Sequence, residues 1–176
     1  MRIISGLYKG RHFTPPANLQ ARPTTDFAKE GLFNLLDNRM DLSDINALDL
    51  FSGTGSICYE FASRGAASVT GIEQNYNHVD YIKKTAYVLK INCLQILKAD
   101  VFKFLETCHT QYDLIFADPP YTLSNLQSIP DIIFAKSLLK EDAWLVIEHG
   151  KKTNFSSHEH FIEERNYGNV HFSFFK

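Results

Sequence analysis

The stretch that decides the fold is INALDLFSGTG, residues 45–55. Its first part, Ile45–Phe51, is mostly apolar and predicts a buried strand. The strand ends in a turn containing Gly53 and Gly55, and glycine lets the backbone approach a ligand closely. Residues 56–63 then predict a helix, whose first amide groups are free to face a ligand. A strand, a glycine turn and a helix in this order predict the first unit of a parallel sheet.

The alternation of strands and helices continues downstream of this unit. Further strands are expected at 68–73, 94–99, 112–117 and 144–148, and helices at 76–89, 101–107 and 123–139. Two last strands, Phe161–Arg165 and Val170–Phe175, flank a turn at Tyr167–Gly168 and predict an antiparallel pair. We therefore expect an α/β fold with a doubly wound, mostly parallel, seven-stranded sheet that closes with an antiparallel hairpin.

Upstream of the sheet, residues 1–40 predict a small extension to a main domain at 41–176. Residues 2–14 predict a hairpin, and Thr24 or Thr25 suits the N-cap of a helix that runs to about residue 38. The first 25 residues carry four basic side chains and no acid, whereas the rest of the chain has a net charge of −6. A basic segment on an acidic body favours an anionic partner at that end, although an ordinary solvated edge has the same composition.

The composition excludes several classes of protein. Of 176 residues, 44% are hydrophobic and 22% are charged, which is typical of a folded globular domain and not of a disordered chain. No apolar run approaches the roughly 20 residues that span a bilayer, and the start lacks the apolar region of a signal peptide, so we expect a cytoplasmic protein. Cys58, Cys93 and Cys108 form no CxxC motif and are expected to be buried, and the histidines suggest no metal site.

Ligands of doubly wound sheets bind outside the carboxyl ends of the strands, so residues at those ends should converge on one site. Glu73 ends the second strand, where a carboxylate can accept both hydroxyl protons of a ribose. Asp100 follows the third strand and can accept from the exocyclic amine of an adenine, while the Val101 amide donates to a ring nitrogen. Asp100 is equally suited to cap the next helix.

The sharpest motif is DPPY, Asp118–Tyr121, at the end of the fourth strand. Two consecutive prolines make a stiff turn without amide hydrogens and leave its carbonyl oxygens free to accept. An aspartate and a proline carbonyl together can bind both hydrogens of a planar amine, and Tyr121 can stack on the ring that carries the amine. The motif therefore predicts a site for an aromatic amine.

These motifs resemble, in order, those of S-adenosylmethionine-dependent methyltransferases that modify exocyclic amines. The opening RIISGLYKGR, the RPTTD of residues 22–26 and the LFN of residues 32–34 resemble the RsmD family, as does the tail YGNVHFSFF of residues 167–175. Ser52 and Thr54 stand where Ala and Ser are common in the family. The family has the Rossmann-like class I methyltransferase fold and methylates N2 of one guanine in bacterial 16S ribosomal RNA.

The resemblance implies a cofactor, a substrate and a set of site residues. S-adenosylmethionine is the implied cofactor, and its implied contacts are Asp49, Phe51, Gly53, Gly55, Glu73, Gln74, Asp100 and Val101. The implied catalytic segment that holds the flipped guanine is Asp118, Pro119, Pro120 and Tyr121. The RNA-facing residues are expected to be Lys9, Arg11, Arg22, Thr24 and Thr25. The implied partner is 16S rRNA or an assembling small subunit, and we expect the enzyme to be a monomer.

Three other functions stay open on sequence grounds. DPPY alone does not separate guanine N2 from adenine N6 in DNA or RNA, or from the amide of a protein glutamine, and the RPTTD opening is what favours guanine. A non-catalytic RNA-binding module on the same fold is disfavoured by the intact glycine turn and DPPY. A nicotinamide oxidoreductase is disfavoured because Cys58 occupies the place of the third glycine of the dinucleotide-binding pattern.

Overall fold

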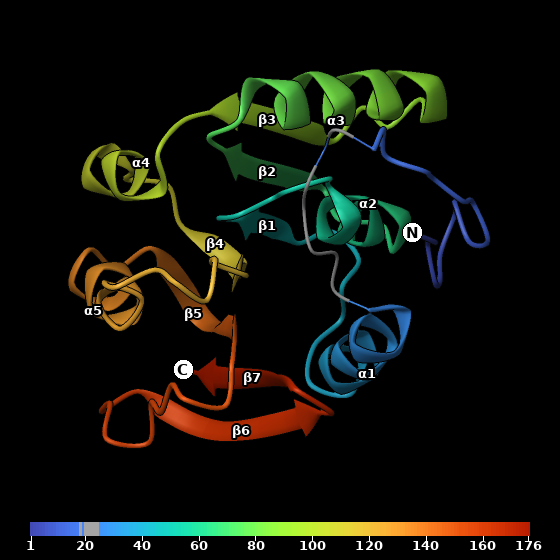
Figure 1. Ribbon diagram of the computed structural model, residues 1–176. Helices are drawn as coiled ribbons and strands as arrows, with labels where there is room; N and C mark the ends of the chain where they lie inside the picture. The colour runs from blue at the N-terminus through green and yellow to red at the C-terminus, as the bar shows by residue number, and fades with distance from the viewer. Residues whose placement is uncertain (18, 20–24) are drawn as a thin grey trace.

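A seven-stranded sheet forms the centre of the protein, whose computed structural model describes residues 1–17, 19 and 25–176 (Figure 1). The strands are β1 Asn46–Asp49, β2 Ser68–Glu73, β3 Leu94–Lys98, β4 Tyr112–Ala117, β5 Leu139–His149, β6 Phe161–Tyr167 and β7 Val170–Phe175. The helices are α1 Asp26–Asp37, α2 Ser56–Ser63, α3 Tyr76–Leu89, α4 Val101–Thr107 and α5 Ser128–Ala135.

The strand order is β3-β2-β1-β4-β5-β7-β6. The strands from β3 to β5 are parallel, and β7 is antiparallel to both β5 and β6. This confirms the fold class expected from the sequence. Because the chain crosses from β1 to β2 on one side and later returns to β4 on the other, the order reverses at β1, and a crevice opens there at the carboxyl ends of the strands.

The two faces of the sheet carry separate hydrophobic cores. Helices α1, α2 and α3 cover one face and α4 and α5 the other (Figure 1). Alternate residues of one strand point to opposite faces, so Ala47 of β1 joins the first core and Leu48 joins the second. Ile3, near the start of the chain, lies in the same core as the α1 residues, so the two predicted parts of the chain share one core.

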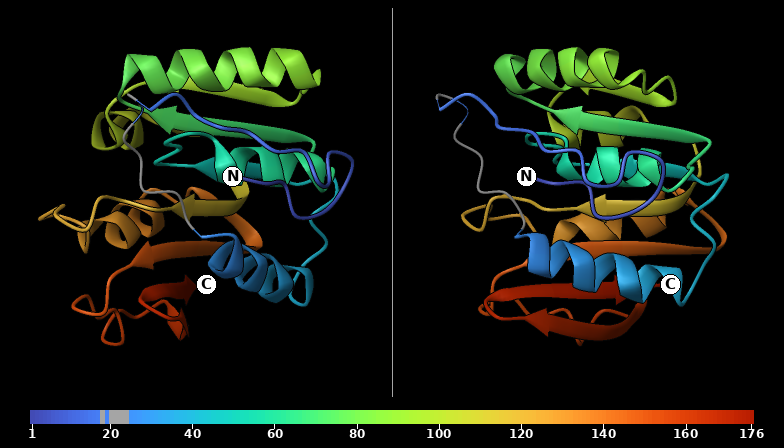
Figure 2. Two further views of the ribbon diagram at one scale, coloured as in Figure 1. Left: turned by 45° about the vertical axis from the view of Figure 1, so that its right-hand side comes forward. Right: turned by 90° about the vertical axis from the view of Figure 1, so that its right-hand side faces the viewer.

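The predicted N-terminal hairpin is present, but it contains one antiparallel bridge, between Arg2 and His12, in place of full strands. The hairpin lies along α2 (Figure 2), and its turn reaches the end of that helix, where the Leu7 amide donates to the Ser63 carbonyl at 2.7 Å. A Cβ atom on Gly6 would lie 1.8 Å from the Ser63 carbonyl oxygen, so this close approach requires glycine.

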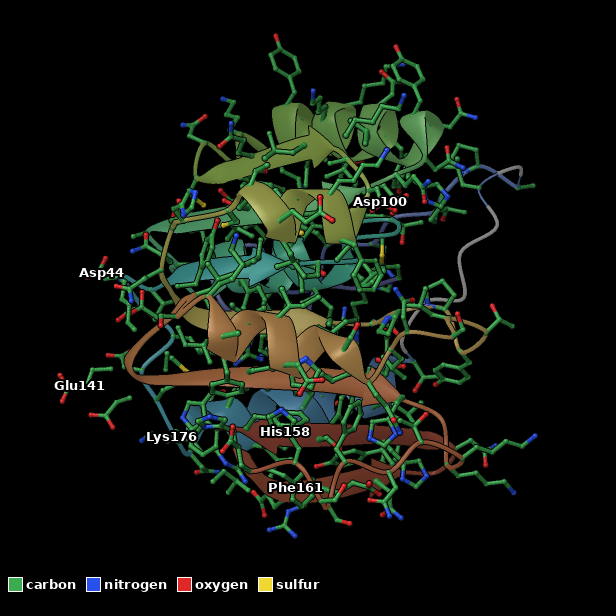
Figure 3. All side chains as sticks on the ribbon, turned by 90° about the vertical axis from the view of Figure 1, so that its left-hand side faces the viewer. Asp44, Asp100, Glu141, His158, Phe161 and Lys176 are labelled. Carbon is green, nitrogen blue, oxygen red and sulfur yellow. The ribbon has the colours of Figure 1, made fainter. Side chains whose placement is uncertain are left out.

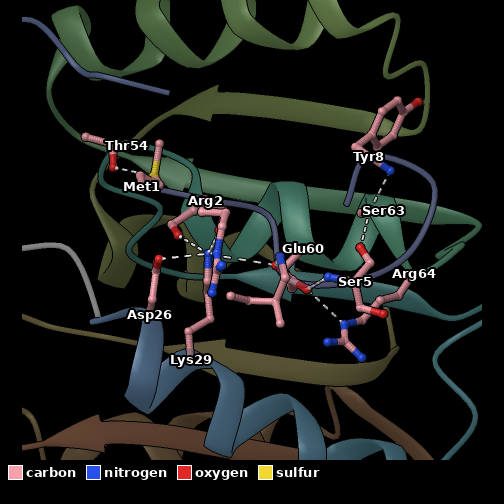
Figure 4. A network of polar contacts seen from close by, with 12 residues as sticks. Met1, Arg2, Ser5, Tyr8, Asp26, Lys29, Thr54, Glu60, Ser63 and Arg64 are labelled. Atoms are coloured by element: carbon pink, nitrogen blue, oxygen red, sulfur yellow. Dashed lines mark hydrogen bonds and ion pairs between the residues drawn. The ribbon is translucent and has the colours of Figure 1, made fainter. Parts of the chain in front are cut away.

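Buried charges join the hairpin, α1 and α2 (Figure 4). Lys29 of α1 is fully buried, and its Nζ donates to the Arg2 carbonyl and to Ser56 Oγ and lies 3.8 Å from Glu60 Oε2. Glu60, also fully buried, accepts from the amides of Ile4 and Ser5 at 2.9 and 3.0 Å. The segment that precedes α1 in sequence is therefore fixed to the helix that follows the glycine turn.

Three expectations about element boundaries were wrong. The helix predicted at 123–139 is confined to α5, because a turn closed by the Leu123 amide on the Pro120 carbonyl precedes it. Ser137 then adopts a left-handed conformation with φ of 52°, which ends the helical path and lets β5 begin at Leu139. The first strand is shorter than predicted and ends at Asp49. The fifth strand, predicted at 144–148, is longer and runs over Leu139–His149, because Leu139 already pairs with Tyr112 of β4.

Two smaller features complete the fold. Within the described part of the chain, no helix combines the length and the apolar character needed to cross a membrane. Cys58 and Cys108 are buried as expected, whereas Cys93 is partly exposed.

Candidate active site

A cavity of about 610 Å³ lies at the carboxyl ends of the parallel strands. This volume is in the range of sites for small molecules and cofactors. Asp100 marks this end of the sheet in Figure 3, and Asp44 and Glu141 mark the opposite end. The structure brings together most of the residues that the sequence predicted for the site, and the cavity is lined by Phe51, Gly53, Glu73, Gln74, Asp100, Val101 and all four residues of DPPY.

The glycine turn forms one wall of the cavity. Gly53 and Gly55 have φ of 53° and 84°, in the left-handed region that favours glycine. The Gly55 amide donates to the Ser52 carbonyl at 2.6 Å, which closes the turn just before α2. A Cβ atom on Gly55 would lie 2.8 Å from the ring of Tyr59. Gly55 itself does not line the cavity; it shapes the turn that presents Gly53.

Glu73 is held in place by the backbone on both of its oxygens. The Gly53 amide donates to Oε2 at 2.8 Å, and the Asn75 amide donates to Oε1 at 2.7 Å. His78, which also lines the cavity, has Nδ1 at 3.6 Å from Oε2. A carboxylate offers about four acceptor positions, so each oxygen can still accept a further hydrogen bond. This geometry fits a ligand with two neighbouring hydroxyl groups.

Asp100 combines the two roles considered for it. Its Oδ1 accepts from the Lys103 amide at 3.1 Å, which caps α4, and the residue also lines the cavity. The cap places Val101 as the first residue of α4, where a backbone amide has no partner inside the helix. Val101 and Phe102, the first two residues of α4, line the cavity, so the free amides of this helix start lie at the cavity wall, where a ring nitrogen could accept from them.

Asp49 lies below the glycine turn and does not line the cavity. It is 1% exposed, and the Cys58 thiol donates to its Oδ2 at 3.1 Å. Burial raises the pKa of Asp49 to about 7, although the Cys58 hydrogen bond acts in the opposite direction. Its other oxygen, Oδ1, is buried without a hydrogen-bond partner among the described residues. Asp49 therefore supports the glycine turn from below, outside the cavity lining.

The DPPY turn forms the opposite wall. It follows β4 directly, with Asp118 half-buried, Pro119 buried and Tyr121 43% exposed at the mouth. The Tyr121 ring packs on Gly150, where a Cβ atom would lie 3.3 Å from the ring. The carboxylate of Asp118 and an aromatic face thus border the same cavity, which suits a flat amine-bearing ring.

Sequence reasoning missed several residues of the cavity. Glu148, the penultimate residue of β5, is 4% exposed and lines the cavity. Its signal was the same as that of Asp118, an acid at the carboxyl end of an apolar strand, but the expectation covered only the first four strands. His78 and Phe102 lie on helices that follow those strands and carried no comparable signal.

The predicted RNA-facing residues do not all meet at the cavity. Thr25 lines it and also caps α1, with Oγ1 accepting from the Ala28 amide at 3.2 Å. Lys9 and Arg11 are exposed on the hairpin and do not line the cavity. Arg22 and Thr24 lie outside the described residues.

Comparison with known proteins gives consistent matches over the whole chain. The family model described as "Conserved hypothetical protein 95" matches residues 1–176. Ribosomal RNA small subunit methyltransferase D of Buchnera aphidicola subsp. Baizongia pistaciae is 32% identical over 154 residues, which are 88% of this chain and 78% of that protein.

Solved structures match the fold equally well. "Putative methyltransferase yhhF from Escherichia coli" has a TM-score of 0.86 at 27% identity and covers 99% of this chain and 96% of its own. The T. thermophilus 16S rRNA N2 G1207 methyltransferase (RsmC), in complex with AdoMet and guanosine, has a TM-score of 0.71 at 19% identity. That match covers 89% of this chain and 44% of the T. thermophilus chain and concerns the fold alone.

Proposed function

The chain belongs to the family described as conserved hypothetical protein 95, and we propose that it transfers a methyl group from S-adenosylmethionine to the exocyclic N2 amine of a guanine in small-subunit ribosomal RNA. The observation that carries this proposal is one cavity bordered by Glu73, Asp100 and the DPPY turn, which come from three different strand ends. Two of these acids suit a nucleoside cofactor, and the third lies where a planar amine has to be received.

The residues of the first wall fit the cofactor. When bound, S-adenosylmethionine supplies a methyl group on a positively charged sulfur. Glu73 would bind the ribose hydroxyls, because its two oxygens are already oriented by backbone amides. Asp100 and the Val101 amide would hold the adenine, and Gly53 leaves room for the methionine part. Asp49 would act from below the turn, as a support for its backbone, because it lies outside the cavity lining.

Asp118 and the proline carbonyls would act on the guanine amine. This amine is a poor nucleophile because its lone pair is delocalised into the ring. Acceptors for both of its hydrogens favour the pyramidal form, in which the lone pair is available for attack. The Asp118 carboxylate also stabilises the positive charge that develops on the nitrogen, as preorganised groups do in other enzymes. Asp118 therefore acts by orientation and electrostatics and need not be a strong base.

Tyr121 would hold the ring that carries the amine. A base paired in a helix cannot reach the cavity, so the target guanine has to leave its stack. The Tyr121 ring, supported by Gly150, offers a face on which the extruded base can stack. We further propose that residues 1–40 face the RNA, that the enzyme acts as a monomer, and that it works in the cytoplasm, where ribosomal subunits assemble.

A transfer assay with purified protein tests the proposal. The protein and labelled S-adenosylmethionine are incubated separately with unmethylated small-subunit particles, with DNA and with a glutamine-bearing release factor. We expect label on the ribosomal RNA of the particles and on neither of the other substrates. Label on DNA adenine or on a protein glutamine instead would replace the guanine assignment, and cofactor binding without transfer to any substrate would indicate a non-catalytic binding module.

A further inference from the structure

Two lysines next to the DPPY turn lie outside the cavity lining. Lys151 and Lys152 are exposed and follow β5 in a turn that the Thr153 amide closes on the Gly150 carbonyl at 3.1 Å. The first residue of this turn is the glycine on which the Tyr121 ring packs. Among the described residues, none of the ion pairs involves either lysine. Two unpaired positive charges therefore stand beside the ring that receives the base.

The position of this turn is fixed by a buried histidine. His149 is fully buried, and burial lowers its pKa, so the imidazole is neutral at pH 7. Its Nδ1 lies 3.0 Å from the Gly150 carbonyl, which can only accept, so Nδ1 carries the proton. Nε2 then accepts from Ser173 Oγ at 2.8 Å. Phe155, buried against His149, anchors the other side of the loop.

An aromatic pair lies on the neighbouring part of the mouth. Phe27 of α1 is 69% exposed, although it is in the first turn of a helix whose cap, Thr25, lines the cavity. Its ring meets the ring of Tyr167 edge to face, with centroids 5.8 Å apart. Tyr167 packs in turn on α1, where a Cβ atom on Gly31 would lie 2.2 Å from the ring. The pair is thus held by elements at the two ends of the chain.

The strand register makes the lysine turn and the aromatic pair parts of one border. His149, which precedes the lysine turn, pairs with His171 of β7. Val170, the residue before His171, lines the cavity and pairs with Tyr167 of β6. The cavity mouth is therefore bordered in turn by the end of β4, the end of β5 and the end of β6. The start of α1 comes next, because Phe27 contacts Tyr167 at the end of β6. We call Phe27, Lys151, Lys152 and Tyr167 the basic-aromatic rim.

We propose that the basic-aromatic rim binds the unpaired RNA on either side of the target guanine, with Lys151 and Lys152 contacting phosphates and Phe27 stacking on a neighbouring base. This inference rests on the proposed function and names the part of the protein that receives the substrate strand. A body of net negative charge repels RNA in general, so unpaired cations at the mouth are well placed to offset that repulsion. Exposed aromatic rings next to cations are the usual surface for single-stranded RNA.

Two variants and two matched controls test the rim. Lys151→Gln/Lys152→Gln removes both charges, and Lys83→Gln/Lys90→Gln removes two exposed lysines from α3 and its C-cap that are in none of the ion pairs of the described residues. Phe27→Ala removes the exposed ring, and Tyr87→Ala removes one that is 85% exposed at the far end of α3. For each protein, binding of an unmodified small-subunit rRNA transcript is measured over a range of salt concentrations, with cofactor binding and melting temperature alongside.

We expect the rim lysine variant to lower the slope of log affinity against log salt by about 1.4, because each phosphate contact to single-stranded nucleic acid contributes about 0.7. Phe27→Ala should weaken binding by about 5- to 150-fold, the range for one stacked base. Cofactor affinity should stay unchanged in both, and the α3 controls should resemble the wild type. If the rim variants and the control variants bind the transcript with the same affinity and the same salt dependence, the proposal is overturned.

Two further results separate this inference from its premise. Rim variants that bind the transcript normally but no longer modify small-subunit particles would show that the rim contacts ribosomal protein, which also overturns the proposal. A wild-type protein that binds the transcript but transfers no methyl group would contradict the proposed function, and the binding data would still decide the role of the rim.

Discussion

Glu73 supports the glycine turn and faces the cavity at the same time. Because it accepts from the Gly53 and Asn75 amides, its removal affects both the ligand contact and the turn. We expect Glu73→Ala to weaken S-adenosylmethionine binding at least tenfold, since a hydrogen bond to a charged group contributes about 1.5–3 kcal/mol. Titration calorimetry measures the effect, with Glu159→Gln as a control at an 87% exposed acid. Unchanged affinity in Glu73→Ala would rule out the ribose contact.

Asp118 is expected to contribute to catalysis and little to folding or cofactor binding. Its carboxylate borders the cavity at the end of β4, and the prolines that follow keep the turn rigid in its absence. Loss of one preorganised partner of developing charge typically lowers the rate about 10²–10³-fold. Asp118→Ala should therefore lose that much single-turnover rate while its melting temperature and cofactor affinity stay near those of the wild type. A wild-type rate in Asp118→Ala would show that DPPY has only a structural role, as a turn.

Asp49 makes the stability of the fold depend on pH in a specific direction. Its pKa is raised to about 7 by burial, from about 3.9 in an unfolded chain, so the folded state holds a proton that the unfolded state releases. This contribution to stability is fully present below about pH 4 and is lost as the pH rises through 7. Asp49→Asn cannot ionise and should escape that loss.

The free energy of unfolding of Asp49→Asn should therefore rise relative to that of the wild type as the pH rises. Relative to the wild type, the variant should gain about 2–3 kcal/mol in free energy of unfolding between pH 5 and pH 8. Urea unfolding at both pH values measures the difference. A difference between the two proteins that does not vary with pH would mean that Asp49 is ionised throughout this range.

The buried charges between α1 and α2 connect the N-terminal hairpin and α1 to the helix that follows the glycine turn. Lys29 lies beside Ser56, the residue that directly follows the glycine turn, and Glu60 holds the hairpin amides. Removal of one member of a buried pair typically destabilises a protein by about 3–5 kcal/mol, because the other charge stays buried. We expect a loss of this size for Glu60→Gln.

An exposed pair provides the control for Glu60→Gln. Asp80 and Lys84 of α3 lie 2.8 Å apart on the surface, where an i,i+4 pair contributes only about 0.3–0.5 kcal/mol. Asp80→Asn should therefore leave the urea midpoint almost unchanged while Glu60→Gln lowers it clearly. Similar midpoints for the two variants would show that water or local rearrangement compensates the buried charge.

The elements that sequence reasoning placed correctly are those whose signals are local. β2, β4, α2 and α3 begin and end at the predicted residues, because apolar runs and helical periodicity are contained within each segment. The error at 123–139 has a different origin. Leu123 and Leu126 have helical spacing, but the turn after DPPY and the left-handed Ser137 fix the ends of α5.

The site as a whole could be predicted as far as chain order determines it. Residues that follow parallel strands meet at one edge of the sheet, so the order of strands and helices is enough to predict that Gly53, Glu73, Asp100 and Asp118 share a cavity. Contact between distant segments has no such signal. The rim joins α1 to the β6–β7 hairpin, and the Lys29–Glu60 pair joins residues 31 positions apart, and neither has a sequence pattern of its own.

The measurement that tests the central claim most directly is mass spectrometry of oligonucleotide fragments of small-subunit rRNA from cells that lack this gene. We expect that one N2-methylguanosine disappears, that the same position becomes unmethylated guanosine, and that the intact gene restores the methyl group. An rRNA with all of its N2-methylguanosines intact, or one that loses a methyl group from adenine instead, would contradict the proposed function.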